Sequence, residues 1–309
     1  MSTPLSVSVP QVQQTQQTQQ AQQVQQVRHG HVDVEGVRVF YRETGPADGP
    51  VLLLLHGFPT ASHQFRRLMD ALGTSHRLIA PDYPGFGHTE APEGFTYTFD
   101  RLADIVEGFT VALGLDRFAL YVFDFGAPVG LRLATRAPER ITGLIVQNGN
   151  AYEDGLSDMA REFSGLRREV PGNEEQVRGL FTLDGTRFQY EAGVADTALL
   201  SPDSWTLDQH FLDLPGRADA QADLAFDYGD NITLYPAWQE WLRTHRPPTL
   251  VLWGAGDPFF LPAGAKAYAR DLPDAEVHVF DGAGHFALET HLPEIAPLID
   301  GFLTALRAG

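Results

Sequence analysis

Three titratable side chains stand at or just beyond the ends of apolar segments that predict buried β-strands. Asp124 ends the run "ALYVFD", Asp257 follows "LVLWGAG", and His285 lies in "DGAGHFALE", after "VHVF". The carboxyl ends of parallel strands meet at one edge of a sheet, so we expect these groups to gather there. Two acids and a histidine in one place can carry out nucleophilic attack and general acid–base chemistry.

Asp124 is the most unusual of these residues, because burying a carboxylate costs free energy unless another group pairs with it or uses it. Each of the three also has a plainer interpretation. Asp124 could cap the helix that follows it. Asp257 could be a turn residue before Pro258, and His285 could be a histidine of a surface loop.

The surrounding sequence predicts the elements that would position these residues. Strand and helix patterns alternate with short links, which indicates an α/β fold with a mostly parallel sheet and helices on both faces. The run "VLLLLHG" from Val51 is typical of a parallel strand covered on both faces. The segment "HVDVEGVRVFYRETG" alternates around Glu35 and Gly36 and predicts a hairpin. Residues 151–246 show helical patterns and no convincing buried strand, so they form a predicted helical insertion.

Five motifs occur in order along the chain: "HGFPT" at His56, "DYPGFGHT", "VFDFGAP", "GAGDPF" and "GAGHFALET". In this order they resemble the oxyanion loop, the Gly-rich loop, the nucleophile elbow, the acid loop and the histidine loop of the α/β-hydrolases. Almost the whole chain after the first 28 residues shares this resemblance. It implies an α/β-hydrolase core at residues 29–150 and 247–309, with residues 151–246 as a helical cap.

The resemblance also implies a role for each site residue. Asp124 would be the nucleophile, Asp257 the acid and His285 the base, with the backbone N–H groups of Phe58 and Phe125 as the oxyanion hole. With aspartate at the elbow, this chain resembles the epoxide hydrolases, haloalkane dehalogenases and haloacetate dehalogenases of the family. An aspartate is already an anion at neutral pH and can displace a group at an sp³ carbon, which leaves an ester that water then hydrolyses.

The neighbours of Asp124 favour epoxide hydrolysis over hydrolytic carbon–halogen cleavage. Haloalkane dehalogenases usually have tryptophan directly after the nucleophile, where this chain has Phe125, which carries no N–H donor. Haloacetate dehalogenases have arginines beside the nucleophile, and residues 125–128 of this chain contain no arginine. An epoxide needs a proton donor for the opening ring, and epoxide hydrolases normally use cap tyrosines.

The predicted cap offers several aromatic donors. Tyr235 in "NITLYPAWQEW" is the first candidate for the donor, and Tyr190 in "RFQYEAG" is the second. The other cap tyrosines are Tyr152 and Tyr228. A dehalogenase would instead need an indole from the cap, and a ligand-binding relative without activity would be expected to lose a member of the triad. This chain keeps all three.

Composition excludes other classes of function. The net charge of −18 argues against nucleic acid and anionic membranes as partners. The absence of cysteine excludes disulfides and thiolate sites and fits a cytoplasmic enzyme. No ligand cluster or phosphate loop implies a cofactor or a metal.

We expect a monomer or homodimer that acts on a small, largely apolar organic substrate and water. The polar repeat at residues 11–27 predicts a disordered Gln-rich tail over residues 1–28.

Overall fold

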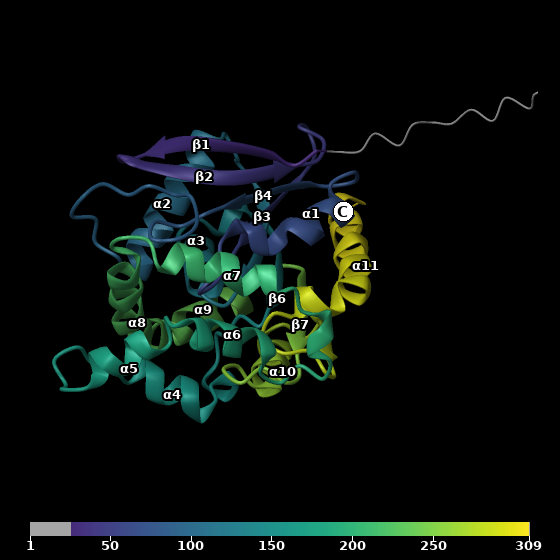
Figure 1. Ribbon diagram of the computed structural model, residues 1–309. Coiled ribbons are helices and arrows are strands. Elements are labelled where there is room, and N and C mark those ends of the chain that lie inside the picture. Colours follow the sequence, from purple (N-terminus) through teal and green to yellow (C-terminus); the bar gives the residue numbers. More distant parts are fainter. Residues whose placement is uncertain (1–25, 309) are drawn as a thin grey trace, which may run out of the picture.

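A computed structural model describes residues 26–308 (Figure 1). The prediction for the Gln-rich tail lies outside this range except at its last residues. One eight-stranded sheet has the strand order β1-β2-β4-β3-β5-β6-β7-β8. The strands are β1 (Arg28–Val34), β2 (Val37–Thr44), β3 (Val51–Leu55), β4 (Arg77–Pro81), β5 (Phe118–Phe123), β6 (Ile141–Gln147), β7 (Thr249–Gly254) and β8 (Glu276–Phe280).

Strands β3 to β8 pair in parallel, whereas β1 and β2 add an antiparallel edge. The predicted hairpin is confirmed: β1 and β2 pair across Glu35 and Gly36, both of which have positive φ angles. The predicted α/β architecture with a mostly parallel sheet is also confirmed. The parallel register brings the ends of β5, β7 and β8 to the same edge of the sheet.

Helices cover both faces of the sheet, and alternate strand residues point to different layers. The covering helices are α1 (Arg66–Leu72), α2 (Phe99–Ala112), α3 (Gly126–Arg136), α10 (Pro262–Asp271) and α11 (Ala287–Ala308). On β3, Leu53 and Leu55 pack in the layer of α2 and α3, whereas Leu52 and Leu54 pack in the layer of α1 and α11. This arrangement explains why the strand is apolar throughout.

The chain between β6 and β7 contains helices and, within the described residues, no strand. These inserted helices are α4 (Asp158–Ser164), α5 (Asn173–Gly179), α6 (Leu183–Glu191), α7 (Pro202–Leu212), α8 (Arg217–Thr233) and α9 (Tyr235–His245). The segment "NITLYPAWQEWLRTH" reads as one helical stretch in sequence. In the structure it divides at Leu234, because Pro236 lies in the first turn of α9 and favours a helix start there.

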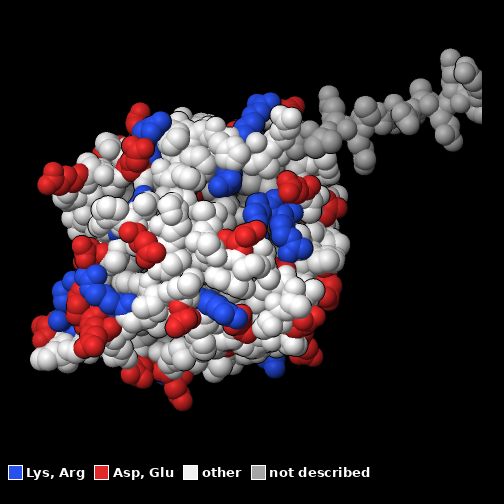
Figure 2. All heavy atoms as spheres, viewed as in Figure 1, with Lys and Arg blue, Asp and Glu red and all other residues white. Residues whose placement is uncertain are grey.

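Basic and acidic side chains are mixed on the surface. Figure 2, which has the same view as Figure 1, shows basic side chains close to acidic ones and no continuous basic area on this face. Ion pairs such as that between Arg168 and Asp223, 2.6 Å apart, account for this mixing. None of the helices in the described part of the chain is long and apolar enough to span a membrane.

Candidate active site

Asp124 lies in a sharp turn between β5 and α3. Its φ angle of 49° is unusual for a residue with a side chain. Gly126 makes the turn possible, because a Cβ atom there would come within 2.1 Å of the carbonyl oxygen of Leu55. The turn therefore holds the Asp124 carboxylate out from the end of the sheet.

Backbone N–H groups hold this carboxylate. The N–H of Phe58 donates to Oδ1 of Asp124 over 2.7 Å, and a hydrogen bond from the N–H of Phe125 also lowers the pKa of Asp124. Burial has the larger effect and raises that pKa above its ordinary value. Gly57 permits the close approach, since a Cβ atom there would lie 2.4 Å from Oδ1 of Asp124.

His285 connects the two acids. Its Nδ1 atom lies 2.7 Å from Oδ2 of Asp257, and its Nε2 atom lies 3.7 Å from Oδ2 of Asp124. Burial lowers the pKa of His285, but the charge of Asp257 and the hydrogen bond to it outweigh this effect, so the pKa is raised. The arrangement fixes Nδ1 as the proton-bearing nitrogen toward Asp257 and leaves Nε2 free to act as a base.

Asp257 is buried and accepts hydrogen bonds at both carboxylate oxygens. Oδ1 accepts from the N–H groups of Phe259 and Phe260, over 2.8 Å and 3.1 Å. Oδ2 accepts from the side-chain amide of Asn148 over 2.7 Å. Asn148 also accepts from the N–H of Gly254, so it ties the end of β6 to the end of β7. This network fixes the orientation of the Asp257 carboxylate.

His56 does not reach the reacting groups. Its Nδ1 lies 3.1 Å from the carbonyl oxygen of Gly57, and its Nε2 accepts from the N–H of Tyr83. Burial lowers the pKa of His56 to about 4, so the ring is neutral at physiological pH. His56 therefore shapes the loop that carries Phe58, as its place in the "HGFPT" motif suggests.

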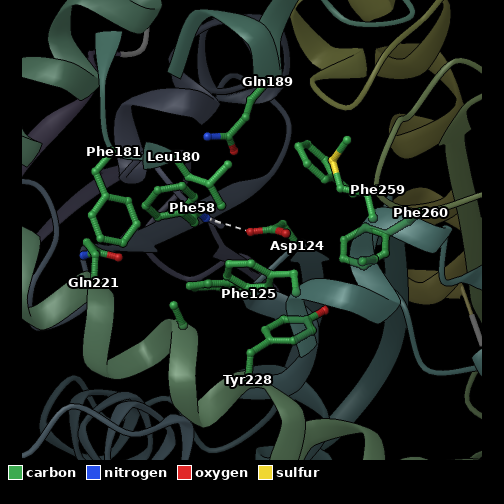
Figure 3. Close-up of a pocket in the computed structure, with 14 residues that line it drawn as sticks. Phe58, Asp124, Phe125, Leu180, Phe181, Gln189, Gln221, Tyr228, Phe259 and Phe260 are labelled. Carbon is green, nitrogen blue, oxygen red and sulfur yellow. Dashed lines mark hydrogen bonds between the residues drawn. The ribbon is translucent and has the colours of Figure 1, made fainter. Parts of the chain in front are cut away.

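A cavity of about 90 Å³ opens above Asp124 (Figure 3). Its volume is well below the ~300–1,000 Å³ of pockets for drug-sized ligands, so it suits a small substrate. Most of the lining is aromatic or aliphatic. The lining residues are Phe58, Asp124, Phe125, Met159, Ala160, Phe163, Leu180, Phe181, Gln189, Gln221, Ala225, Tyr228, Phe259 and Phe260.

Tyr228 of α8 is the tyrosine that lines this cavity. Its ring lies 5.7 Å from that of Phe125, measured between ring centres. Burial is the main cause that raises the pKa of Tyr228 well above its ordinary value, so the phenol keeps its proton. Tyr235 lies behind it: a hydrogen bond between the two tyrosines contributes to the pKa shifts of both. Asn150 donates to the Tyr235 hydroxyl over 3.2 Å.

Tyr190 is not brought to the cavity. Its hydroxyl donates to Asp208 of α7 over 2.6 Å, and its ring stacks on Phe286 with the ring centres 4.0 Å apart. Asp208 is also paired with His63 of the core, 3.1 Å away. These contacts place Tyr190 in a buried cluster that joins the inserted helices to the core. No tryptophan of the described chain lines the cavity.

Three polar residues of the site, Asn148, Gln189 and Gln221, are not among the candidates predicted from the sequence, and Tyr228 is only one of the other cap tyrosines there. Asn148 directly follows the apolar strand β6. The sequence could therefore have predicted that it lies at the carboxyl edge of the sheet, beside the other site residues. Gln221 and Tyr228 lie seven positions apart with Ala225 between them, the spacing of one helix face. Gln189 on α6 also lines the cavity, and no pattern in the sequence marks it.

The fold and this arrangement of side chains define the class of the protein. The family model described as alpha/beta hydrolase fold matches residues 50–292, and the chain belongs to that family. The predicted resemblance to α/β-hydrolases is therefore confirmed.

Individual relatives are hydrolases of more than one kind. An uncharacterized hydrolase of Saccharomyces cerevisiae is 45% identical over 270 residues, which cover 85% of this chain and 92% of the relative. Haloalkane dehalogenase 2 of Mycobacterium tuberculosis is 39% identical over 85% of this chain and 90% of its own length. Epoxide hydrolase 2 of Caenorhabditis elegans is 26% identical over 84% and 75%. The solved haloalkane dehalogenase DbeA of Bradyrhizobium elkani superposes with a TM-score of 0.75 at 25% identity, over 92% and 99% of the two chains.

Proposed function

We propose that this protein hydrolyses small epoxides to diols through a covalent ester on Asp124. The observation that carries the proposal is the pairing of two groups across one cavity. A carboxylate held by backbone N–H groups faces an apolar space into which a protonated phenol, Tyr228, also projects. A relative named as an epoxide hydrolase supports the same assignment. In this proposal residues 151–246 act as the cap, because they supply the phenol.

The geometry separates the roles of the two carboxylate oxygens. Oδ1 of Asp124 is held by the N–H of Phe58, whereas Oδ2 lies on the side of His285. Oδ2 attacks a ring carbon, the carbon–oxygen bond of the epoxide breaks, and the new alkoxide takes the proton of Tyr228. The product of this step is an ester whose carbonyl oxygen is Oδ1, the oxygen to which the N–H of Phe58 donates, so this N–H would serve the oxyanion hole.

His285 then takes a proton from water, and the hydroxide adds to the ester carbonyl carbon. The positive charge on the ring is stabilised by Asp257, 2.7 Å away. The tetrahedral intermediate collapses, the diol leaves, and one oxygen of the water remains in the Asp124 carboxylate. The protonated His285 gives its proton to the departing alkoxide, which completes the diol. The proton left on the Asp124 carboxyl group is released to solvent and balances the one that the Tyr228 phenolate takes up, so all three groups return to their starting forms. The reaction uses only protein groups and water.

Hydrolytic dehalogenation is the second candidate. The identity of 39% to a haloalkane dehalogenase favours it. A departing halide needs an N–H donor rather than a proton, and Phe125 has none. The amide of Gln189, which lines the cavity, is the side chain that could supply one. The same Asp124 ester and the same hydrolysis by His285 would follow.

A matched substrate pair tests the proposal. Purified protein is incubated with 1,2-epoxyhexane and, separately, with 1-bromohexane, and the organic products and free bromide are measured. We expect hexane-1,2-diol from the epoxide at a rate at least ten times that of bromide release. Bromide release without diol formation would replace the proposal with the second candidate. Turnover of neither would favour a ligand-binding relative without activity.

A further inference from the structure

Gln221 presents a buried hydrogen-bond acceptor that no protein group uses. Its side chain lines the cavity and is only 2% exposed. The amide nitrogen Nε2 donates to the carbonyl oxygen of Gly85 over 2.9 Å. The amide oxygen Oε1 is buried and has no partner. Figure 3 shows this oxygen turned toward the interior of the pocket.

The contact with Gly85 fixes which way the amide points. A carbonyl oxygen can only accept, so the group that meets it must be the N–H side of Gln221. Turning the amide over would place two oxygens against each other. The cavity therefore faces an acceptor, and a buried acceptor without a donor is unfavourable. A ligand that brings a hydrogen-bond donor to Oε1 would relieve this.

The position of Gln221 along α8 gives the approximate length of such a ligand. Gln221, Ala225 and Tyr228 share one face of the helix and all line the cavity. Seven residues of helix span about 10 Å. The phenol of Tyr228 and the acceptor of Gln221 therefore lie toward opposite ends of a mainly apolar face, with Ala225 between them.

On the basis of the proposed function, we propose that the preferred substrate is a short epoxide with a hydroxyl group at the end remote from the ring. Tyr228 serves the ring oxygen beside Asp124, and Oε1 of Gln221 accepts a hydrogen bond from the remote hydroxyl. An apolar spacer of a few carbon atoms crosses Ala225. Gln221 is then a specificity-determining residue, and it takes no part in the chemical steps.

Two isosteric substrates test this assignment. In 5,6-epoxyhexan-1-ol a hydroxyl stands where 1,2-epoxyheptane has a methyl group, and kcat/KM is measured for both. We expect the wild-type protein to prefer the hydroxyl compound by about 10-fold or more, because a site built to bond a hydroxyl discriminates against the analogue that lacks it. Shortening the spacer in 4,5-epoxypentan-1-ol and 3,4-epoxybutan-1-ol should reduce the preference.

Gln221→Met removes the acceptor at similar volume. It should abolish the preference by lowering kcat/KM for the hydroxyl compound while keeping or raising it for 1,2-epoxyheptane. Gln189→Met is the matched control on the same cavity and should leave the ratio of the two substrates unchanged. Equal turnover of both substrates by the wild type would overturn the inference, as would an equal loss for both in Gln221→Met.

A binding experiment separates failure of this inference from failure of the proposed function. The affinity for 1-hexanol is measured by ligand-observed NMR in the wild type and in Gln221→Met. We expect at least a several-fold loss of affinity in the variant, whatever bond the enzyme breaks. Turnover of neither epoxide would reject the proposed function alone. Equal affinity of the two proteins for 1-hexanol would reject the role of Gln221.

Discussion

The Nε2 atom of His285 lies 3.7 Å from Oδ2 of Asp124, which is longer than a hydrogen bond. The histidine is thus close enough to influence the carboxylate but is not bonded to it. In the proposed mechanism His285 has no role in the first attack and is needed only to activate water. The two chemical steps can therefore be separated by changing the histidine alone.

We expect His285→Gln to form the ester on Asp124 and then stop. The carboxylate still has its N–H donors from Phe58 and Phe125, so the attack proceeds, but no base remains to deprotonate water. Mass spectrometry of the Asp124 peptide after incubation with 1,2-epoxyhexane should show the added mass of the substrate. Asp124→Asn should give no adduct under the same conditions. An adduct on a different residue would show that the nucleophile is wrongly assigned.

Acid pH should separate the same two steps in the wild-type protein. Hydrolysis needs neutral His285, whose pKa is raised above its ordinary value of 6.5 by Asp257, so its rate should fall as pH falls through that raised pKa. Alkylation needs ionised Asp124, whose pKa is raised by burial from an ordinary value of 3.8. Rapid-quench experiments at decreasing pH should show the ester accumulating where protonation of His285 slows hydrolysis and Asp124 still attacks. A parallel fall of both rates would contradict these roles.

Asn148 is expected to act by positioning Asp257. Asn148→Ala removes its hydrogen bonds to Asp257 and Gly254, so we expect a loss of about 1–3 kcal/mol in the free energy of unfolding. Hydrolysis of the ester should slow by roughly 10- to 100-fold through misplacement of the base. Denaturant titration and single-turnover kinetics measure the two effects.

Asn148→Gly is the matched control for backbone strain. The φ angle of Asn148 is 44°, which glycine adopts more easily than alanine does. Both variants lose the same hydrogen bonds, so they should share the kinetic defect, while the glycine variant is the more stable. A kinetic defect confined to Asn148→Ala would show that strain, not the hydrogen bond to Asp257, is responsible.

The parts of the site that sequence could predict are those that the sheet itself positions. Asp124 directly follows β5, Asp257 follows β7, and His285 follows β8, so the apolar strands predict where they meet. The choice of tyrosine depends instead on how the inserted helices pack on the core. The resemblance favours Tyr235, which lies near the end of the cap, close to the position expected for the donor tyrosine. In the structure Tyr228 lines the cavity, and Tyr235 does not.

Gln221 shows a second limit of prediction from sequence. Its amide matters because Gly85, far away in the chain, occupies the amide nitrogen and leaves the oxygen facing the cavity. Nothing in the local pattern of α8 encodes that contact. The same applies to Tyr190, whose partner Asp208 lies on a different helix and holds the hydroxyl away from the reacting groups.

Three tyrosine variants test which phenol serves the opening ring. Tyr228→Phe removes the hydroxyl that lines the cavity, so alkylation by an epoxide should slow by about 100- to 10,000-fold, the usual size of a general-acid contribution. Tyr235→Phe removes only the group behind it and should have a smaller effect, because Tyr228 remains.

Tyr190→Phe is the control, since it disturbs packing without touching the chemistry. It leaves Asp208 without one hydrogen bond, so the variant should be less stable by about 1–3 kcal/mol, while its alkylation rate stays at the wild-type value. Rapid-quench kinetics and denaturant titration of all three variants give the comparison. If Tyr235→Phe were slower than Tyr228→Phe, Tyr235 would be the donor. If no variant slowed epoxide alkylation and bromide were released from 1-bromohexane, the leaving group would be a halide, and Gln189→Met would then be the variant that blocks its departure.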